Sequence, residues 1–283
     1  MLYILLSICC SVIVSVMLKL AKRYHIDVLQ AITWNYSTAI LLTWFIFKPH
    51  LHPSQNVHVY IYLIIGLLLP VLFLIIAASV RVTGIVRTDV AQRLSLLIPI
   101  IAAFLLFGEV LTPLKIVGIV AGLSAIICSV PWQKGKGKKP GFSWLYLLIV
   151  FAGMGLIDVL FKQIALFNDV PYTTSLFIIY IVSFMVSLVF LGYQIYTKKT
   201  KFSFPHILIG WALGVANFGN ILFYIKAHQA LTHKPLTVFA AVNIGVIILA
   251  TIVGLAIFKE KLSLLNKIGI TLAVLAIIVI TRA

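Results

Sequence analysis

Ten apolar stretches of about twenty residues follow one another along this 283-residue chain, separated by short polar breaks. An α-helix needs about 20 mostly apolar residues to cross the hydrocarbon core of a bilayer. The apolar residues are continuous and do not alternate with polar ones, which is typical of helices and not of barrel strands. The predicted spans are residues 2–19, 29–47, 57–80, 88–107, 112–131, 143–163, 171–196, 204–227, 235–257 and 263–281. The sequence therefore predicts an all-α polytopic membrane protein.

The composition excludes a soluble domain. Hydrophobic residues make up 63% of the chain and charged residues 10%, whereas a soluble domain carries about 25% charged residues. The net charge of +16 comes from 22 Lys and Arg residues against six acidic ones. These cations are scattered between the apolar stretches, a pattern that is typical of anchoring at lipid headgroups. We therefore expect the lipid bilayer as a partner and no nucleic acid.

The two halves of the chain resemble each other. The basic stretch QKGKGKKPG (133–141) lies near the midpoint and leaves five predicted spans on each side. We expect a first repeat at 1–132, a linker at 133–142 and a second repeat at 143–283. Five is an odd number, so the second repeat must enter the membrane in the opposite orientation, as in secondary transporters. At an offset of 151 residues, the informative matches are Phe107/Phe258, Glu109/Glu260 and Gly118/Gly269.

The paired motifs also resemble a known family. The segments 90–126 (VAQRLSLLIPIIAAFLLFGEVLTPLKIVGIVAGLSAI) and 242–280 (VNIGVIILATIVGLAIFKEKLSLLNKIGITLAVLAIIVI) each carry F-G/K-E-x-L-T/S before a final apolar helix. This pattern is similar to that of the EamA-like family of the drug/metabolite transporter (DMT) superfamily. The resemblance implies a basket of ten helices, with helices 5 and 10 peripheral and a central cavity lined by helices 1, 3, 4, 6, 8 and 9. It also implies transport of small polar metabolites, often amino acids, usually outward.

Orientation has two opposed predictions. Lys and Arg are enriched in the breaks after the odd-numbered spans, which places both termini outside the cell by the positive-inside rule. The family resemblance implies cytoplasmic termini instead.

The eighth span contains the clearest polar stripe. Asn217, Asn220, Tyr224 and His228 are three or four residues apart, so they lie on one helical face. Polar groups in hydrocarbon cost several kcal/mol unless they find partners or line water. The stripe therefore predicts either a substrate cavity or hydrogen bonds between helices.

The fourth span offers a second polar set, consisting of Gln92, Arg93 and Ser95. The Arg93 guanidinium could hold a carboxylate or phosphate bidentately, or could extend to the lipid headgroups. Pro99, one turn further, is expected to break the helix locally and act either as a hinge or as a static kink.

A carboxylate and a lysine lie four residues apart in the sixth span. Asp158 and Lys162 can pair on one helical face, either as a proton-responsive switch or as a neutralised structural pair. Trp34 of the second span could stack a ligand or pack in the interior, and Asn243 falls in the first half of the ninth. The predicted substrate-binding residues are thus Asn217, Asn220, Tyr224, Arg93, Gln92, Ser95, Asn243 and Trp34; Asp158 and Lys162 are coupling candidates, and Pro99 is the candidate hinge.

Glu109 raises a separate question because the chain has so few acids. It stands just before Thr112-Pro113, where the fifth span opens, and an acid near a helix N-terminus that carries proline is capping chemistry. We expect Glu109 to cap the helix at 112–131, with Glu260 in the same role in the second repeat.

These patterns favour a secondary active or exchange transporter that exports a small polar metabolite by alternating access. The sequence carries no H-E-x-x-H, G-x-S-x-G or P-loop motif and no Cys/His metal spacing, so we expect neither an enzyme nor a cofactor or metal. A bacterial inner-membrane location and a monomer or weak homodimer are also expected. The alternatives are a non-transporting membrane scaffold and a membrane enzyme acting on lipid, for which His50, His52 and His58 are the close histidine set.

Overall fold

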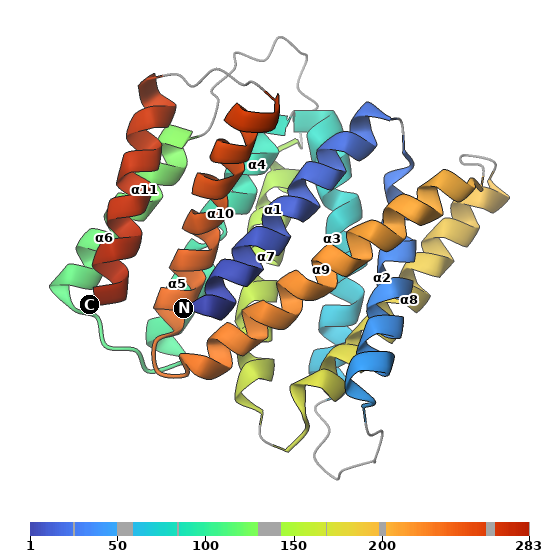
Figure 1. Cartoon of the computed structure of the whole chain (residues 1–283), viewed down its shortest axis with the longest axis horizontal. Helices are drawn as coiled ribbons and strands as arrows, with labels where there is room; N and C mark the ends of the chain where they lie inside the picture. The colour runs from blue at the N-terminus through green and yellow to red at the C-terminus, as the bar shows by residue number, and fades with distance from the viewer. Residues whose placement is uncertain are drawn as a thin grey trace.

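The computed structural model describes residues 1–24, 26–49, 59–83, 85–129, 143–167, 169–197, 202–258 and 264–282. All regular secondary structure in these ranges is α-helical (Figure 1). The helices are α1 (Leu2–Arg23), α2 (Val28–Phe47), α3 (Val59–Thr83), α4 (Ile85–Leu94), α5 (Leu97–Leu105), α6 (Pro113–Ser129), α7 (Ser143–Leu166), α8 (Tyr172–Tyr196), α9 (Phe204–Ala230), α10 (Pro235–Phe258) and α11 (Leu264–Arg282). The basic linker at 133–142, Glu260 and the three histidines His50, His52 and His58 lie outside the described residues.

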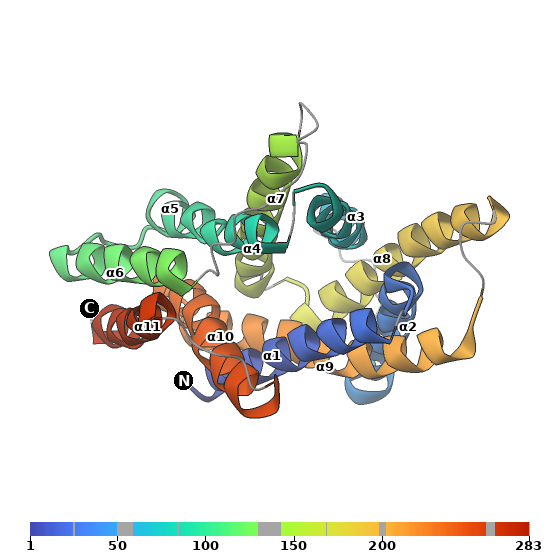
Figure 2. The same ribbon diagram turned by 90° about the horizontal axis from the view of Figure 1, so that it is seen from above.

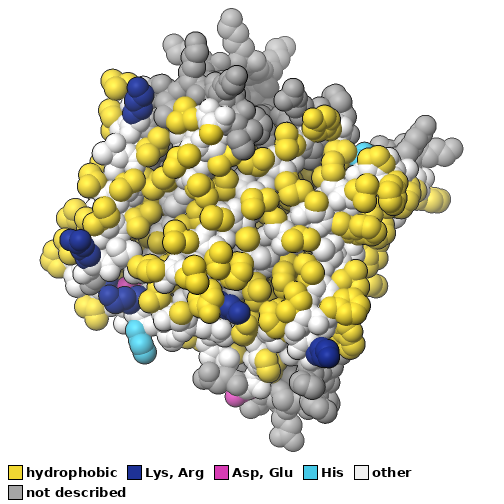
Figure 3. All heavy atoms as spheres, viewed as in Figure 1, with side chains coloured by type: hydrophobic (Ala, Val, Ile, Leu, Met, Phe, Trp, Pro, Cys, Tyr) yellow, Lys and Arg dark blue, Asp and Glu magenta, His cyan; other side chains and the backbone are white. Residues whose placement is uncertain are grey.

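The protein is a multi-pass membrane protein. Within the described ranges, five helical segments are long and apolar enough to cross a bilayer: Val59–Val80, Trp144–Leu166, Tyr172–Tyr196, Phe204–Ala230 and Pro235–Ala256. Shorter apolar helical segments lie at Leu2–Leu18, Ala91–Leu105 and Pro113–Cys128. The outer face in Figure 3 is covered mainly by hydrophobic side chains, as contact with lipid tails requires.

The fourth predicted span, 88–107, is divided into two helices. We predicted a local break at Pro99; α4 ends at Leu94 and α5 begins at Leu97, so the break lies before the proline. Pro99 has no N–H to donate, and its ring clashes with the carbonyl four residues earlier, that of Ser95. The Ser95 carbonyl instead accepts from the backbone N–H of Ile98 at 3.0 Å, so the break lies one turn before the proline. In the second half, Ala250 replaces this proline and α10 is continuous.

Helices from the two halves of the chain pack against one another. α1 packs on α9 and α10, α3 packs on α7 and α8, and α2 lies against α8 and α9. α6 and α11 pack on each other and lie side by side at one edge of the molecule in both ribbon views (Figures 1 and 2). The peripheral position that the family resemblance implied for the fifth and tenth spans is therefore observed.

Two glycines of α9 allow it to approach α2 closely. A Cβ atom on Gly210 would lie 2.8 Å from the backbone oxygen of Ala31, and one on Gly214 would lie 2.7 Å from that of Asn35. Both separations are shorter than van der Waals contact, so only glycine fits without a shift of the backbone. This close crossing positions the cavity-facing side of α9.

Glu109 caps a different helix from the one that we predicted. The hydroxyl of Thr112 accepts from the backbone N–H of Lys115 at 3.2 Å, so Thr112 caps α6. The Glu109 carboxylate accepts from the backbone N–H of Leu236 at 2.8 Å, in the first turn of α10. Its other oxygen lies 3.0 Å from the Lys115 ammonium. The prediction that Glu109 caps the helix at 112–131 is therefore wrong.

Candidate functional site

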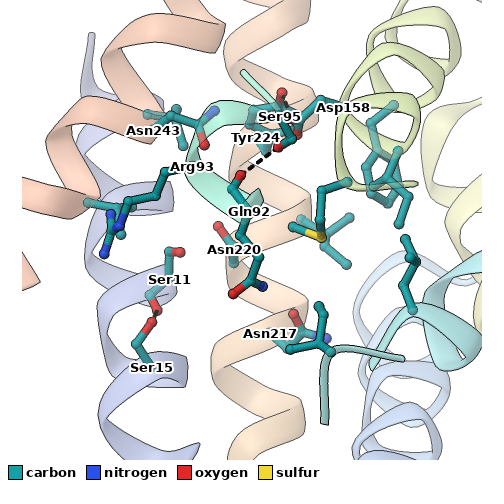
Figure 4. A pocket seen from close by; sticks show the side chains of 18 of the residues that line it. Ser11, Ser15, Gln92, Arg93, Ser95, Asp158, Asn217, Asn220, Tyr224 and Asn243 are labelled. Atoms are coloured by element: carbon teal, nitrogen blue, oxygen red, sulfur yellow. Dashed lines mark hydrogen bonds between the residues drawn. The ribbon is translucent and has the colours of Figure 1, made fainter. Parts of the chain in front are cut away.

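A polar cavity of about 320 Å³ lies between α1, α3, α4, α7, α9 and α10. These helices correspond to spans 1, 3, 4, 6, 8 and 9, the set that the resemblance implied; Ile126 of α6 adds to the lining. The polar lining residues are Ser11, Ser15, Gln92, Arg93, Ser95, Asp158, Asn217, Asn220, Tyr224 and Asn243 (Figure 4). Apolar side chains of α3, α7, α9 and α10 complete the wall. The cavity is therefore mixed in character, as sites for small metabolites commonly are.

The stripe on α9 faces this cavity. Asn217, Asn220 and Tyr224 all line it, as their spacing requires for one helical face. The side-chain oxygen of Asn220 also accepts from the Ser7 hydroxyl of α1 at 2.9 Å. Asn220 thus both lines the cavity and bonds between helices, which unites the two interpretations of the stripe.

Asp158 places a carboxylate in the cavity wall. It accepts from the Tyr224 hydroxyl at 3.1 Å, and Asn243 lies against the same carboxylate. The Asn243 amide also donates to the carbonyl of Phe239 at 2.9 Å, which fixes its orientation. A carboxylate held in this way can bind an ammonium group or exchange a proton with the cavity.

Lys162 does not pair with Asp158, contrary to our prediction. The Lys162 ammonium donates to the carbonyl of Thr232 at 3.0 Å and lies 5.8 Å from the ring centre of Phe107. The side chain is completely buried and does not line the cavity. The i, i+4 spacing brings the two residues to one face of α7, but Asp158 accepts from Tyr224 whereas Lys162 donates to Thr232.

The wall formed by α4 carries the cation. Gln92 and Arg93 come from the last turn of α4, and Ser95 comes from the break that follows. The Ser95 hydroxyl donates to the Gln92 carbonyl, which satisfies a group that the break exposes. In Figure 4, Arg93 and Asp158 lie on different sides of the cavity. The cavity wall therefore carries one cation and one anion.

Trp34 and Pro99 lie outside the lining. The Trp34 ring packs against Phe184 and Phe202, with ring centres 6.3 and 6.2 Å apart, and fills space at the α2–α8–α9 junction. Pro99 acts on the cavity indirectly, through the helix break that presents Ser95.

The resemblance implied that the first helix lines the cavity, but its two polar lining residues were not predicted. Ser11 and Ser15 line the cavity from this helix, four residues apart. The Ser15 hydroxyl donates to the Ser11 carbonyl at 3.1 Å, a bond within the helix that makes serine inconspicuous in an apolar span. The four-residue spacing of Ser11 and Ser15, which places them on one helical face, could have identified them as cavity residues. No group of three or more His, Cys, Asp or Glu residues suited to a metal ion occurs in the described part of the chain.

Comparison with known proteins agrees with this geometry. The model of the EamA-like transporter family matches residues 1–130. The chain belongs to the EamA-like transporter family. This family is part of the DMT superfamily and consists of membrane transporters, not enzymes.

Two further similarities cover nearly the whole EamA-like chain. A protein of Haemophilus influenzae, described only as uncharacterized, is 41% identical over 282 residues, which span 97% of this chain and 95% of the relative. A crystal structure with 19% sequence identity matches with a TM-score of 0.69 and covers 99% of this chain and 98% of its own. The latter likeness concerns the fold alone, and it extends over both halves.

Proposed function

We propose that this EamA-like protein is a secondary active or exchange transporter that exports a small polar metabolite across the bacterial inner membrane. The observation that carries the proposal is the single cavity in which polar side chains from five helices meet. Polar side chains in a membrane interior are costly unless they find partners or line a site. Here α1, α4, α7, α9 and α10 each contribute polar side chains to one cavity.

The charges in the cavity favour an amino acid or a related zwitterion as the substrate. The Arg93 guanidinium can form two parallel hydrogen bonds with a carboxylate. Asp158, on another wall, can accept from an ammonium group, and the amides of Asn217 and Asn220 can bond to the polar atoms between the two charges. The apolar residues of α3 leave room for a hydrophobic side chain.

Alternating access would use two inverted five-helix repeats, at 1–132 and 143–283. The helix pairing supports this division: α1 packs on α9 and α10, and its counterpart α7 packs on α3 and on α4 and α5. α1 and α7 also run in opposite directions in Figure 1. Rocking of one repeat against the other around a fixed site would expose the cavity to each side in turn.

Two sources could drive the export. Asp158 is the acid that lines the cavity, so a proton that binds there could couple transport to the pH gradient. Exchange of one metabolite for another requires no titrating group. We expect a monomer or weak homodimer, since the cavity is complete within one chain.

A thermal-shift screen of the purified protein against pooled metabolites tests the proposal. A ligand that stabilises the wild type should then show saturable counterflow in proteoliposomes. The double variant Asn217→Ala/Asn220→Ala should lose both responses, while Gln229→Ala, on the same helix but outside the cavity, should keep them. Stable protein without saturable flux of any stabilising ligand would favour a non-transporting scaffold instead.

A further inference from the structure

Asp158, Tyr224 and Asn243 line the part of the cavity nearest the α9–α10 connection, and we call these three residues its floor. A second layer of residues lies one helical turn beyond this floor. Each of three helices carries one floor residue and, four residues away on the same face, a completely buried residue. The pairs are Asp158 and Lys162 on α7, Tyr224 and His228 on α9, and Asn243 and Phe239 on α10. We name Lys162, His228 and Phe239 the plug. It lies between the cavity and the end of the molecule where α9 connects to α10.

The plug is packed, but its hydrogen bonding is incomplete. The His228 ring lies perpendicular to Tyr224 with centres 4.7 Å apart, and it lies 4.7 Å from the ring centre of Phe239. Neither ring nitrogen of His228 has a hydrogen-bond partner among the described residues. A buried polar group without a hydrogen-bond partner destabilises the folded state, and a hydrogen bond to water removes this cost. The plug would therefore gain hydrogen bonds if this end of the cavity became hydrated.

Charged side chains from both halves of the chain hold the α9–α10 connection over the plug. Lys162 of α7 donates to the carbonyl of Thr232, and Glu109, in the α5–α6 connection, accepts from the N–H of Leu236. Lys115 pairs with Glu109 at 3.0 Å, and the side chains of this pair are only 9% and 2% exposed. The α5–α6 and α9–α10 connections lie at the same end of the molecule (Figure 1). We name Glu109, Lys115 and Lys162 the latch; Lys162 belongs to both groups, because its stem packs in the plug and its ammonium holds the connection.

We propose that the latch is a gate: it keeps the cavity closed on the α9–α10 side, and its release opens the cavity to that side. The inference rests on the proposed transport function, for which it supplies the gate residues. Burying an ion pair requires that both charges lose their water, and this penalty offsets much of their attraction. Apolar residues of similar volume would therefore stabilise a permanently closed interior equally well. A charged latch differs in that it has a second favourable state, in which water solvates it.

The gate is connected to the cavity through shared helices. α7 carries Asp158 in the cavity floor and Lys162 in the latch, one turn apart. A ligand or proton that repositions Asp158 therefore acts on the helix that holds Thr232. Such a two-state packed element is the usual means by which a local event opens one side of a transporter.

Side-specific cysteine labelling tests the gate without requiring transport. Cys9, Cys10 and Cys128 are first replaced by Ala, and Asn243→Cys then serves as a reporter in the cavity floor. In a separate variant, His233→Cys, in the exposed α9–α10 connection, identifies which face of a sealed vesicle carries that connection. A membrane-impermeant thiosulfonate is then added to each face of the vesicles in turn.

We expect slow labelling of the reporter from the α9–α10 side in the otherwise unaltered protein. Lys162→Met and Glu109→Ala should each raise that rate at least fivefold, while Glu109→Gln, which keeps an acceptor for Leu236, should raise it less. Lys226→Met is the matched control, because Lys226 lies on α9 near the same end but contacts Tyr3 and not the latch.

An unchanged labelling rate in both Lys162→Met and Glu109→Ala would overturn the gate, provided that the variants label normally from the opposite face. If one variant fails to fold, the other decides. Increased labelling in a protein that transports no solute would support the gate and refute the proposed function, so the two failures are distinguishable.

Discussion

The substitution Gly214→Ala tests the α2–α9 crossing that positions the cavity stripe. The added methyl would lie 2.6 Å from Cβ of Thr38 and 2.7 Å from the backbone oxygen of Asn35, where ordinary contact begins at 3.4 Å. The Asn35 carbonyl cannot rotate away as a side chain would. The two helices must therefore separate by roughly 0.7 Å, the difference between 2.7 Å and 3.4 Å. Overpacking of this kind costs about 1–3 kcal/mol.

Gly192→Ala is the matched control for this substitution. Gly192 lies in α8, and a Cβ atom there would meet nothing within 4 Å. Both substitutions gain about 1 kcal/mol of helix propensity, so the difference between the two variants isolates the crossing. At about 2–4 °C per kcal/mol, Gly214→Ala should melt about 2–12 °C below Gly192→Ala in scanning fluorimetry of the detergent-solubilised protein. Equal melting temperatures would refute the close crossing.

Three further predictions concern the cavity acid, the helix break and the latch. Asp158→Asn should abolish flux driven by a pH gradient in proteoliposomes and, because Asp158 also faces the ammonium group of the substrate, should raise the concentration that half-saturates counterflow; undiminished proton-driven flux would exclude coupling through this acid. Pro99→Ala restores an N–H that can bond the Ser95 carbonyl, so the melting temperature should rise and the counterflow rate should fall, and a hinge role fails if neither changes. Glu109→Ala and Lys115→Met should each lower the melting temperature, and a double-mutant cycle should give a coupling energy of about 1–3 kcal/mol, whereas strictly additive effects would contradict the buried pair.

The α9 stripe could be predicted from the sequence because polar residues are rare in an apolar span and their spacing fixes a common face. Asn217, Asn220 and Tyr224 line the cavity for this reason. Residues in α4 and α7 could be selected by the same rarity. The spacing of polar residues along one helix thus identifies its polar face. The length of each continuous apolar stretch identifies the helices themselves.

Partners between distant segments could not be predicted in this way. Glu109 bonds to Leu236, 127 residues away, and Lys162 bonds to Thr232, 70 residues away. The partners expected from local spacing were the N-terminus of the helix at 112–131 for Glu109 and Asp158 for Lys162. Only the packing of the α9–α10 connection against α5–α6 and α7 decides between them.

Trp34 illustrates the same limit for aromatic residues. A tryptophan beside polar residues in a span is compatible with ligand stacking or with packing between helices. Its contacts with Phe184 and Phe202 depend on how α2 meets α8 and the start of α9, which the sequence of α2 alone does not contain.

The most direct test of the account is substrate protection of a cysteine at position 217, in a background where Cys9, Cys10 and Cys128 are Ala. Asn217→Cys would be alkylated in proteoliposomes with increasing concentrations of the metabolite that supports counterflow. The account predicts that the metabolite slows alkylation, with half of the effect at the concentration that half-saturates counterflow by the same Asn217→Cys protein. Unchanged alkylation at a concentration that saturates counterflow would place the transport pathway elsewhere and contradict the account.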